Sequence, residues 1–330
     1  MKFLPPIGVF AHKRPAHLKR CLEAIVRSEG FLGKKLSITI FCDAAQEKRQ
    51  QDAVEQTVEI ARKFGRAELV VREKNYGFRN ITEGISQLCD RSGRAIIIED
   101  DCHIAPDFLP FMCNALERYQ DDPRVFMISG FMYFGVQSNA QPTFFLNTPF
   151  IWGWGTWKRA WDKLDWDCTG WESFIQEKKN RYYLDCLGSY PFSKMLGKTL
   201  TGICNTWDAR WMYTVAKEKG LTLYPHKSLV WNCGCGGGTH GKQELDMNPS
   251  LGERETYIHG DMARSEFDYP RLAPSVYLGK AFPRKVALDK RSLRYLAIVF
   301  LKQRLRRGER KRLWLKFLWQ KMALFFTKRP

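Results

Sequence analysis

Apolar and polar residues follow two periods over roughly the first 130 residues. Short apolar runs, rich in β-branched residues, predict buried strands at 7–11, 36–42, 67–72, 95–98 and 125–129. Apolar residues at helical spacing predict helices between them, one ending near residue 27 and others at 47–64, 81–90 and 106–119. This alternation predicts an α/β fold, with a mostly parallel central sheet of Rossmann-like winding flanked by helices.

The pattern changes from residue 144 onward, where aromatic residues become frequent. Six of the eleven tryptophans lie between Trp152 and Trp171. A helix is predicted at 205–218, and a strand at 229–240 that runs into a glycine-rich loop. We therefore expect one domain over residues 1–283, with two halves that meet near residue 130.

The positive charge of the chain is concentrated at its C-terminal end. The formal net charge is +18, and residues 284–330 contain sixteen Lys and Arg against two acidic residues. Their helical, amphipathic pattern with Trp and Phe predicts a tail that associates with an anionic membrane surface. The alternatives are a helix packed on the body and a nucleic-acid-binding arm. The second is disfavoured because residues 1–283 lack a basic binding face.

The cysteines and the N-terminus suggest a compartment. The ten cysteines form no paired CxxC spacing, so we interpret them as reduced core residues rather than zinc ligands. The first residues lack the apolar core of a signal peptide, and no apolar stretch is long enough to span a membrane. Together these features predict a cytoplasmic protein.

Charged and amide side chains follow the predicted strands. Three carboxylates, Glu99, Asp100 and Asp101, come directly after the most apolar strand. Unpaired, they would repel one another and lose hydration, whereas Mg²⁺ or Mn²⁺ would relieve that cost. Four further side chains follow the ends of the other strands, namely Arg14, Asp43, Asn75 and Arg79. Because strand ends of an α/β sheet converge on one crevice, these groups suit a nucleoside diphosphate held with a metal ion.

Four sequence blocks, spanning roughly residues 5–240, resemble a known family. They are Arg14-Pro15, the acidic triplet 99–101, Gly153-Trp154-Gly155, and Trp207-Asp208. In this order they are similar to glycosyltransferases of the GT-A fold, most of all to the N-acetylglucosaminyltransferase I type and its bacterial relatives. The resemblance implies the GT-A fold, with residues 1–130 binding a nucleotide-sugar and 131–283 binding an acceptor. A glycine-rich dinucleotide motif after the first strand is absent, which argues against NAD or FAD.

The resemblance also implies roles on the donor side. Asp101 matches a metal ligand, whereas Glu99 and Asp100 match acids that contact the sugar and the ribose. Asp43 matches a contact to the edge of uracil, although a helix cap is the alternative. Arg14 lies where the family contacts the diphosphate or nucleotide, and Asn75 and Arg79 follow a strand end near the same groups.

Further residues are assigned to catalysis and to the acceptor. Asp208 matches the general base, although a surface ion pair with Arg210 or Lys217 is the alternative. His240 matches a histidine that reaches the metal or the diphosphate. Trp152 and Trp154, flanked by glycines, are candidates for an acceptor-sugar platform, and core packing is the alternative.

The function implied is a metal-dependent, inverting glycosyltransferase that uses Mn²⁺ or Mg²⁺. Its donor would be a nucleotide-sugar, with UDP favoured by the resemblance alone, and its acceptor a hydroxyl of a glycan or lipid-linked glycan. With the basic tail, this predicts a peripheral protein on the inner face of the cell membrane that takes part in polysaccharide biosynthesis. The alternatives are a nucleotidyltransferase, for which residues 8–20 lack a glycine-rich loop with a lysine, and a non-catalytic carbohydrate-binding protein.

Overall fold

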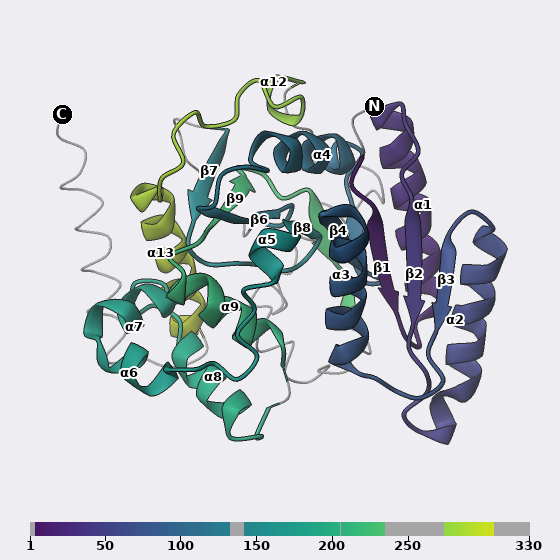
Figure 1. Ribbon diagram of the computed structural model, residues 1–330, viewed down its shortest axis with the longest axis horizontal. Helices are drawn as coiled ribbons and strands as arrows, with labels where there is room; N and C mark the ends of the chain where they lie inside the picture. Colours follow the sequence, from purple (N-terminus) through teal and green to yellow (C-terminus); the bar gives the residue numbers. More distant parts are fainter. Residues whose placement is uncertain (1–3, 133–141, 205, 235–273, 307–330) are drawn as a thin grey trace.

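The computed structural model describes residues 4–132, 142–204, 206–234 and 274–306 (Figure 1). The predicted metal or phosphate ligand His240, most of the glycine-rich loop, and residues 307–330 of the basic tail lie outside the described residues.

Within the described residues, eight strands form one sheet in the order β3-β2-β1-β4-β8-β6-β9-β7. Their bounds are β1 (Ile7–Ala11), β2 (Ile38–Cys42), β3 (Glu68–Val71), β4 (Arg94–Glu99), β6 (Val125–Ser129), β7 (Thr143–Leu146), β8 (Trp154–Trp157) and β9 (Leu221–Pro225). The first four strands of the sequence pair in parallel, as predicted. Strand β8 is antiparallel to both β4 and β6, so the complete sheet is mixed.

Helices cover both faces of this sheet. In chain order they are α1 (Pro15–Leu32), the 3-10 helix η1 (Lys48–Gln50), α2 (Gln51–Phe64), α3 (Phe78–Ser92), α4 (Phe108–Arg118), α5 (Lys158–Trp161), α6 (Trp171–Gln176), α7 (Lys178–Leu184), α8 (Phe192–Leu200), α9 (Asp208–Lys217), α12 (Pro274–Tyr277) and α13 (Lys290–Arg306). Helix α1 begins at Pro15, whose fixed φ and missing N–H suit a first helical position. It ends at Gly33 in the left-handed conformation.

The core consists of two layers, one on each side of the sheet. In β4, Ile96 and Ile98 face the layer formed with α1, α2 and α4, whereas Ala95 and Ile97 face the layer formed with α3, α5 and α9. Successive side chains of a strand point to opposite faces, so an apolar strand of this kind is buried on both sides. This explains why the apolar runs, and not alternating patterns, marked the central strands.

Four tryptophans fill the second layer. Trp154, Trp161, Trp207 and Trp211 lie with ring centroids 5.3–6.2 Å apart. Trp154 has no exposed surface, so the prediction that it forms an acceptor-sugar platform is wrong, and the alternative of core packing holds. Trp154 lies on β8, in the middle of a sheet covered on both faces, and its flanking glycines therefore serve packing. Trp152 is half-buried and meets the ring of Phe131 edge to face at 4.6 Å.

The first part of the basic tail lies against the body. Helix α13 buries Leu293, Leu296 and Phe300, and the ring of Phe300 packs against Phe192. No helix in the described part of the chain combines the length and the apolarity needed to cross a bilayer. Membrane association of the tail thus stays a prediction that depends on residues 307–330.

Candidate active site

The acidic triplet lies at the carboxyl end of β4, in the centre of the sheet. Glu99 is the last residue of β4, and the N–H of Asp100 donates to the carbonyl oxygen of Phe10 at 2.9 Å, which continues the pairing with β1. Asp100 is 1% and Asp101 5% exposed, whereas Glu99 retains some exposure. The tertiary structure therefore buries two of the three carboxyl groups of the triplet.

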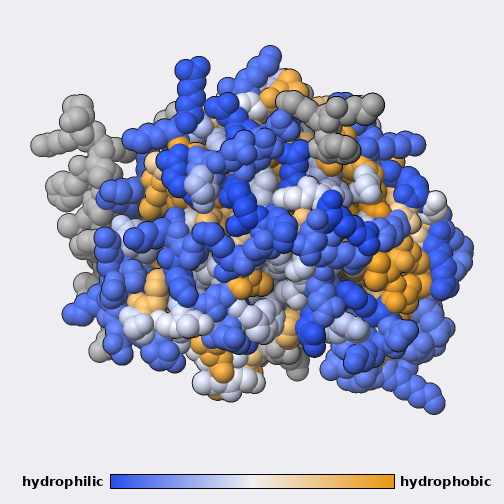
Figure 2. Space-filling view, viewed as in Figure 1, coloured by the Kyte–Doolittle hydropathy of each residue, from blue (hydrophilic) through white to orange (hydrophobic). Residues whose placement is uncertain are grey.

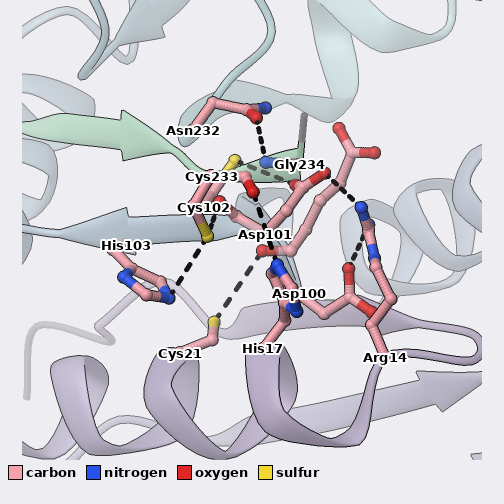
Figure 3. Close-up of polar contacts among 11 residues, drawn as sticks. Arg14, His17, Cys21, Asp100, Asp101, Cys102, His103, Asn232, Cys233 and Gly234 are labelled. Atoms are coloured by element: carbon pink, nitrogen blue, oxygen red, sulfur yellow. Dashed lines mark hydrogen bonds and ion pairs between the residues drawn. The ribbon is translucent and has the colours of Figure 1, made fainter. Parts of the chain in front are cut away.

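Arg14 compensates this buried negative charge (Figure 3). It lies between β1 and α1, and its guanidinium donates to Asp101 Oδ2 at 2.7 Å and to Asp100 Oδ1. Although burial alone would lower the pKa of Arg14, the charges of Asp101 and Asp100 raise it above its ordinary value. Burial raises the pKa of Asp100 to about 6, against the opposing effect of Arg14. The second oxygen of that carboxyl, Oδ2, is buried without a hydrogen-bond partner in the described residues.

A second, two-stranded sheet brings a distant segment onto Asp101. Strand β10 (Val230–Asn232) pairs antiparallel with β5 (Cys102–Ile104), and the N–H of Cys233 donates to the carbonyl oxygen of Asp101 at 2.9 Å. A Cβ placed on Gly234 would lie 2.3 Å from Asp101 Oδ2, so only glycine allows this approach. Residues 232–234 are therefore part of the site, which the sequence analysis missed. The short apolar run Leu229-Val230-Trp231, followed by a glycine-rich segment, was the signal available there.

Thiol and imidazole groups surround Asp101 on the side opposite Arg14 (Figure 3). The thiol of Cys102 contacts Asp101 Oδ1 at 3.7 Å, and that of Cys233 lies 3.5 Å from Nε2 of His103. Burial raises the pKa of Cys233 to about 12, and it raises the pKa of Cys102 as well. Burial also lowers the pKa of His103 to about 4. At neutral pH the thiols of Cys102 and Cys233 and the imidazole of His103 are therefore uncharged.

Asp43 organises the loop after β3. Its carboxylate accepts hydrogen bonds from the N–H groups of Tyr76 at 2.8 Å and Gly77 at 2.7 Å, and from the amide of Asn75 at 3.3 Å. A further bond comes from the N–H of Ala44, and these four donors match the lone-pair sites of a carboxylate. Asp43 is 4% exposed. In this structure it positions the loop and does not cap the next helix, and its contact with a nucleotide base stays a prediction.

Asn75 and Arg79 have different surroundings. The amide of Asn75 donates to the carbonyl oxygen of Ala44 at 2.7 Å, so its side chain ties the ends of β2 and β3 together. Arg79 has a side chain that is 67% exposed and forms an ion pair with Glu83 on α3 at 3.2 Å. Asn75 thus belongs to the same hydrogen-bonded loop as Asp43, whereas the side chain of Arg79 extends from the first turn of α3 into solvent.

The charge of Asp208, in the other half of the chain, acts on Glu99 of the acidic triplet. Asp208 is the first residue of α9, where the helix dipole stabilises a negative charge. Burial raises the pKa of Glu99, and the charge of Asp101 raises it further against the opposing effect of Arg14; Asp100 and then Asp208 add smaller effects in the same direction as Asp101. Arg210 donates to the carbonyl oxygen of Trp166, and Lys217 donates to Asp165. The role of Asp208 as the general base stays a prediction.

The carboxylate oxygens of this site suit a hard divalent cation that also binds a phosphate. The described residues contain no group of three or more His, Cys, Asp or Glu arranged around one point. Mg²⁺ needs no such cage, because it is usually held by one or two carboxylates together with substrate phosphates. Asp101 and the unpartnered Oδ2 of Asp100 provide carboxylate oxygens of this kind. The residues present therefore fit Mg²⁺ or Mn²⁺ bound together with a diphosphate.

A family model described as GNT-I family matches residues 2–189, which is more than half of the chain. The chain belongs to the GNT-I family. The matched region contains Arg14, the acidic triplet and β8, and the resemblance inferred from the sequence motifs is confirmed, together with the class of glycosyltransferase. No curated protein matches the chain.

Several solved structures of glycosyltransferases are similar to this GNT-I family member at low sequence identity. TarS of S. aureus is 12% identical with a TM-score of 0.40, over 92% of this chain and 49% of that chain. The mannosyltransferase PcManGT of Pyrobaculum calidifontis, in complex with GDP-Man and Mn²⁺, is 12% identical with a TM-score of 0.36, over 78% of this chain and 84% of that one. The galactosyltransferase LgtC is 9% identical with a TM-score of 0.30, over 53% of this chain and 65% of that one. The chain thus spans less than two thirds of LgtC and about half of TarS.

Proposed function

We propose that this GNT-I family member transfers a sugar from a nucleotide-sugar to a hydroxyl group of a glycan. One observation carries the proposal. The buried carboxylates Asp100 and Asp101 share Arg14 at the ends of β1 and β4, and the charge of Asp208 acts on the same triplet from α9. Two acidic groups from different halves of the chain, beside a buried cation, suit a reaction in which a diphosphate leaves and a hydroxyl attacks.

On the donor side, the proposal assigns the diphosphate to Arg14 and Asp101. Arg14 presents a planar set of donors that matches phosphate oxygens. Bound Mn²⁺ or Mg²⁺ would be held by Asp101 and Asp100, and it would neutralise negative charge that develops on the leaving diphosphate. Glu99 lies next to these groups and suits hydroxyl groups of the donor. Asp43 holds the loop of Asn75, and the base and ribose would lie at this edge of the sheet.

On the acceptor side, Asp208 takes the proton of the attacking hydroxyl. The oxygen of that hydroxyl forms the new bond to the anomeric carbon while the bond from that carbon to the diphosphate breaks. A single displacement of this kind inverts the anomeric configuration. A positioned carboxylate base contributes on the order of 10²–10⁴-fold in rate. Of the two tryptophans predicted to bind the acceptor sugar, the proposal keeps Trp152, which is half-buried beside Phe131.

The choice of UDP as the nucleotide and the site in the cell are also proposals. UDP is favoured by the resemblance of the motifs to the N-acetylglucosaminyltransferase I type. The basic tail would attach the enzyme to the inner face of the cell membrane, where a lipid-linked glycan could serve as acceptor. Each Lys or Arg near an anionic surface contributes roughly 1 kcal/mol to such binding.

Nucleotide binding tests the donor site directly. Full-length protein is titrated with UDP-, GDP- and CMP-sugars in Mn²⁺ or in EDTA, in parallel with Asp101→Asn. The matched control is Asp162→Asn, which removes an exposed carboxylate paired with Lys158 at 2.8 Å. We expect metal-dependent binding of one nucleotide, lost in Asp101→Asn and kept in Asp162→Asn. If no nucleotide binds under either condition while glycans do, the chain is a carbohydrate-binding protein and the proposal is refuted.

A further inference from the structure

A surface groove runs along α3, outside the acidic site. It has a volume of about 630 Å³ and lies between α3 and the segment that follows α5. Trp161, Leu164 and Trp166 form its apolar side, and polar side chains of α3, Gln87 among them, form the other. The side of the molecule that carries α3 and α5 faces the viewer in Figure 2.

One lining residue of the groove, Trp166, contacts both halves of the chain near the candidate active site. Trp166 stacks on Phe78, the first residue of α3, at a centroid distance of 5.4 Å. Phe78 follows Gly77, whose N–H is bound by Asp43. The guanidinium of Arg210, two residues after Asp208, lies over the ring of Trp166 at 4.9 Å. One end of the groove therefore touches the donor loop and the helix of the proposed base.

The other end lies at the C-terminal part of α3. The lining residues on α3 extend from Thr82 to Arg91, which corresponds to about 13 Å along a helix. This length exceeds one pyranose ring, so a ligand that fills the groove is a chain of several sugar units and not a single one.

The chemistry of the lining is that of a neutral, amphipathic ligand. The acidic side chains are compensated, since Glu83 pairs with Arg79 at 3.2 Å and Asp90 with Lys158 at 2.7 Å. The groove therefore presents little net charge to attract an ionic polymer. Leu164 and the ring of Trp166, both partly exposed, lie on one side, and the amide of Gln87 lies on the other. These groups suit the C–H faces and the hydroxyl groups of pyranose rings.

Gln87 is the polar group best placed to bind a ligand. The hydroxyl of the neighbouring Ser86 is already used, because it accepts from Nε1 of Trp161 at 2.9 Å and donates to the carbonyl oxygen of Thr82 at 3.0 Å. Gln87 has no hydrogen bond to any of the described residues, although its amide has two donors and an acceptor.

We propose that this groove binds the non-reacting part of an extended, neutral glycan acceptor and leads its terminal sugar toward Asp208. This inference rests on the proposed function. It adds a second contact region for the acceptor, outside the crevice at the strand ends.

The test compares Gln87→Ala with Gln56→Ala in the full chain. Gln56 is an exposed glutamine in the middle of α2, which packs on the other face of the sheet from α3 (Figure 1). Each protein is applied to an array of neutral oligosaccharides of one to six sugar units, and binding of a nucleotide-sugar panel with Mn²⁺ is measured on the same samples. We expect wild-type binding to strengthen with glycan length. Gln87→Ala should weaken binding of glycans of three or more units about fivefold, from the loss of a hydrogen bond, and leave single sugars unaffected.

Each outcome decides the proposal. It is supported if Gln87→Ala loses length-dependent glycan binding while Gln56→Ala retains it. The inference is overturned if wild type binds no glycan on the array, or if Gln87→Ala binds every length as wild type does. Absence of nucleotide-sugar binding in wild type would instead count against the proposed function, and the glycan result would still decide the groove.

Discussion

Removal of Arg14 tests whether the acidic site is held together by one cation. In Arg14→Ala, the carboxylates of Asp100 and Asp101 stay in place with side chains 1% and 7% exposed and lose their shared donor. The remaining contact to Asp101 Oδ1 is a thiol at 3.7 Å, which provides no compensating charge. The variant therefore leaves two buried, adjacent negative charges.

The size of the effect follows from burial. Removing one partner of a buried ion pair costs ~3–5 kcal/mol. The Arg14 side chain is 19% exposed, so water reaches the vacated space and we expect the lower end, about 3 kcal/mol at neutral pH. Arg91→Ala is the matched control, because Arg91 bonds Glu68 at 2.8 Å with both side chains about half exposed. An exposed pair of this kind contributes ~0–1 kcal/mol.

The pH dependence gives a second, independent signature. Burial raises the pKa of Asp100 from 3.8 to about 6. Between pH 3.8 and pH 6, Asp100 therefore holds a proton in the folded protein that it has lost in the unfolded chain. The contribution of this protonation to the free energy of unfolding is complete below about pH 4 and is lost as the pH rises through 6. Arg14 opposes the shift, so its removal raises this pKa further and moves the loss to higher pH. The cost of Arg14→Ala should therefore be smaller at pH 5 than at pH 8.

Urea unfolding followed by tryptophan fluorescence measures these differences, at pH 5 and pH 8, in EDTA. Arg14→Ala combined with Asp100→Asn should recover part of the loss at pH 8, because one buried charge is removed. The reasoning is refuted if Arg14→Ala costs no more than Arg91→Ala at pH 8, or if its cost is the same at both pH values.

Three further predictions concern the base, the buried imidazole and the glycine beside Asp101. Asp208→Asn should lower kcat by about 10²–10⁴-fold and leave the Kd for the nucleotide-sugar unchanged, and equal weakening of both would contradict a role as base. Burial lowers the pKa of His103 from 6.5 to about 4, so the free energy of unfolding decreases as the pH drops from 6.5 to 4. His103→Phe should reduce the difference between the unfolding free energies at pH 7 and pH 4 by roughly 3 kcal/mol. An unchanged difference would argue against a buried neutral imidazole. Gly234→Ala places a methyl group 2.3 Å from Asp101 Oδ2 and should weaken metal-dependent donor binding at least tenfold, whereas Gly197→Ala, which meets nothing within 4 Å, should bind donor as wild type does.

Local sequence patterns accounted for the donor half of the site. Arg14, Asp43 and the acidic triplet each follow a strand end, and parallel strands bring such ends to one edge of the sheet. Their approximate convergence could therefore be predicted before any coordinates. The specific pairing could not, because Arg14 lies 86 residues from Asp100 in the chain and its side chain could have reached several acidic partners.

The tryptophan-rich region shows the opposite case. Glycines around Trp154 suggested an exposed ring, but β8 enters the sheet between β4 and β6 and buries that ring completely. An antiparallel strand inserted into a parallel sheet leaves no periodic signature in its own four residues. Its exposure depends on which strands lie beside it, and that information is spread over the whole chain.

The amino-acid sequence alone established the alternating strands and helices, the acidic triplet and the family, because these depend on local periodicity and on motifs a few residues long. Three features depended on contacts between distant segments: the bridge from Arg14 to Asp100 and Asp101, the approach of Gly234 to Asp101, and the groove beside α3. The physical reason is that burial and pairing energies act between residues that are close in space, and a local pattern sets which face is apolar but not which partner covers it.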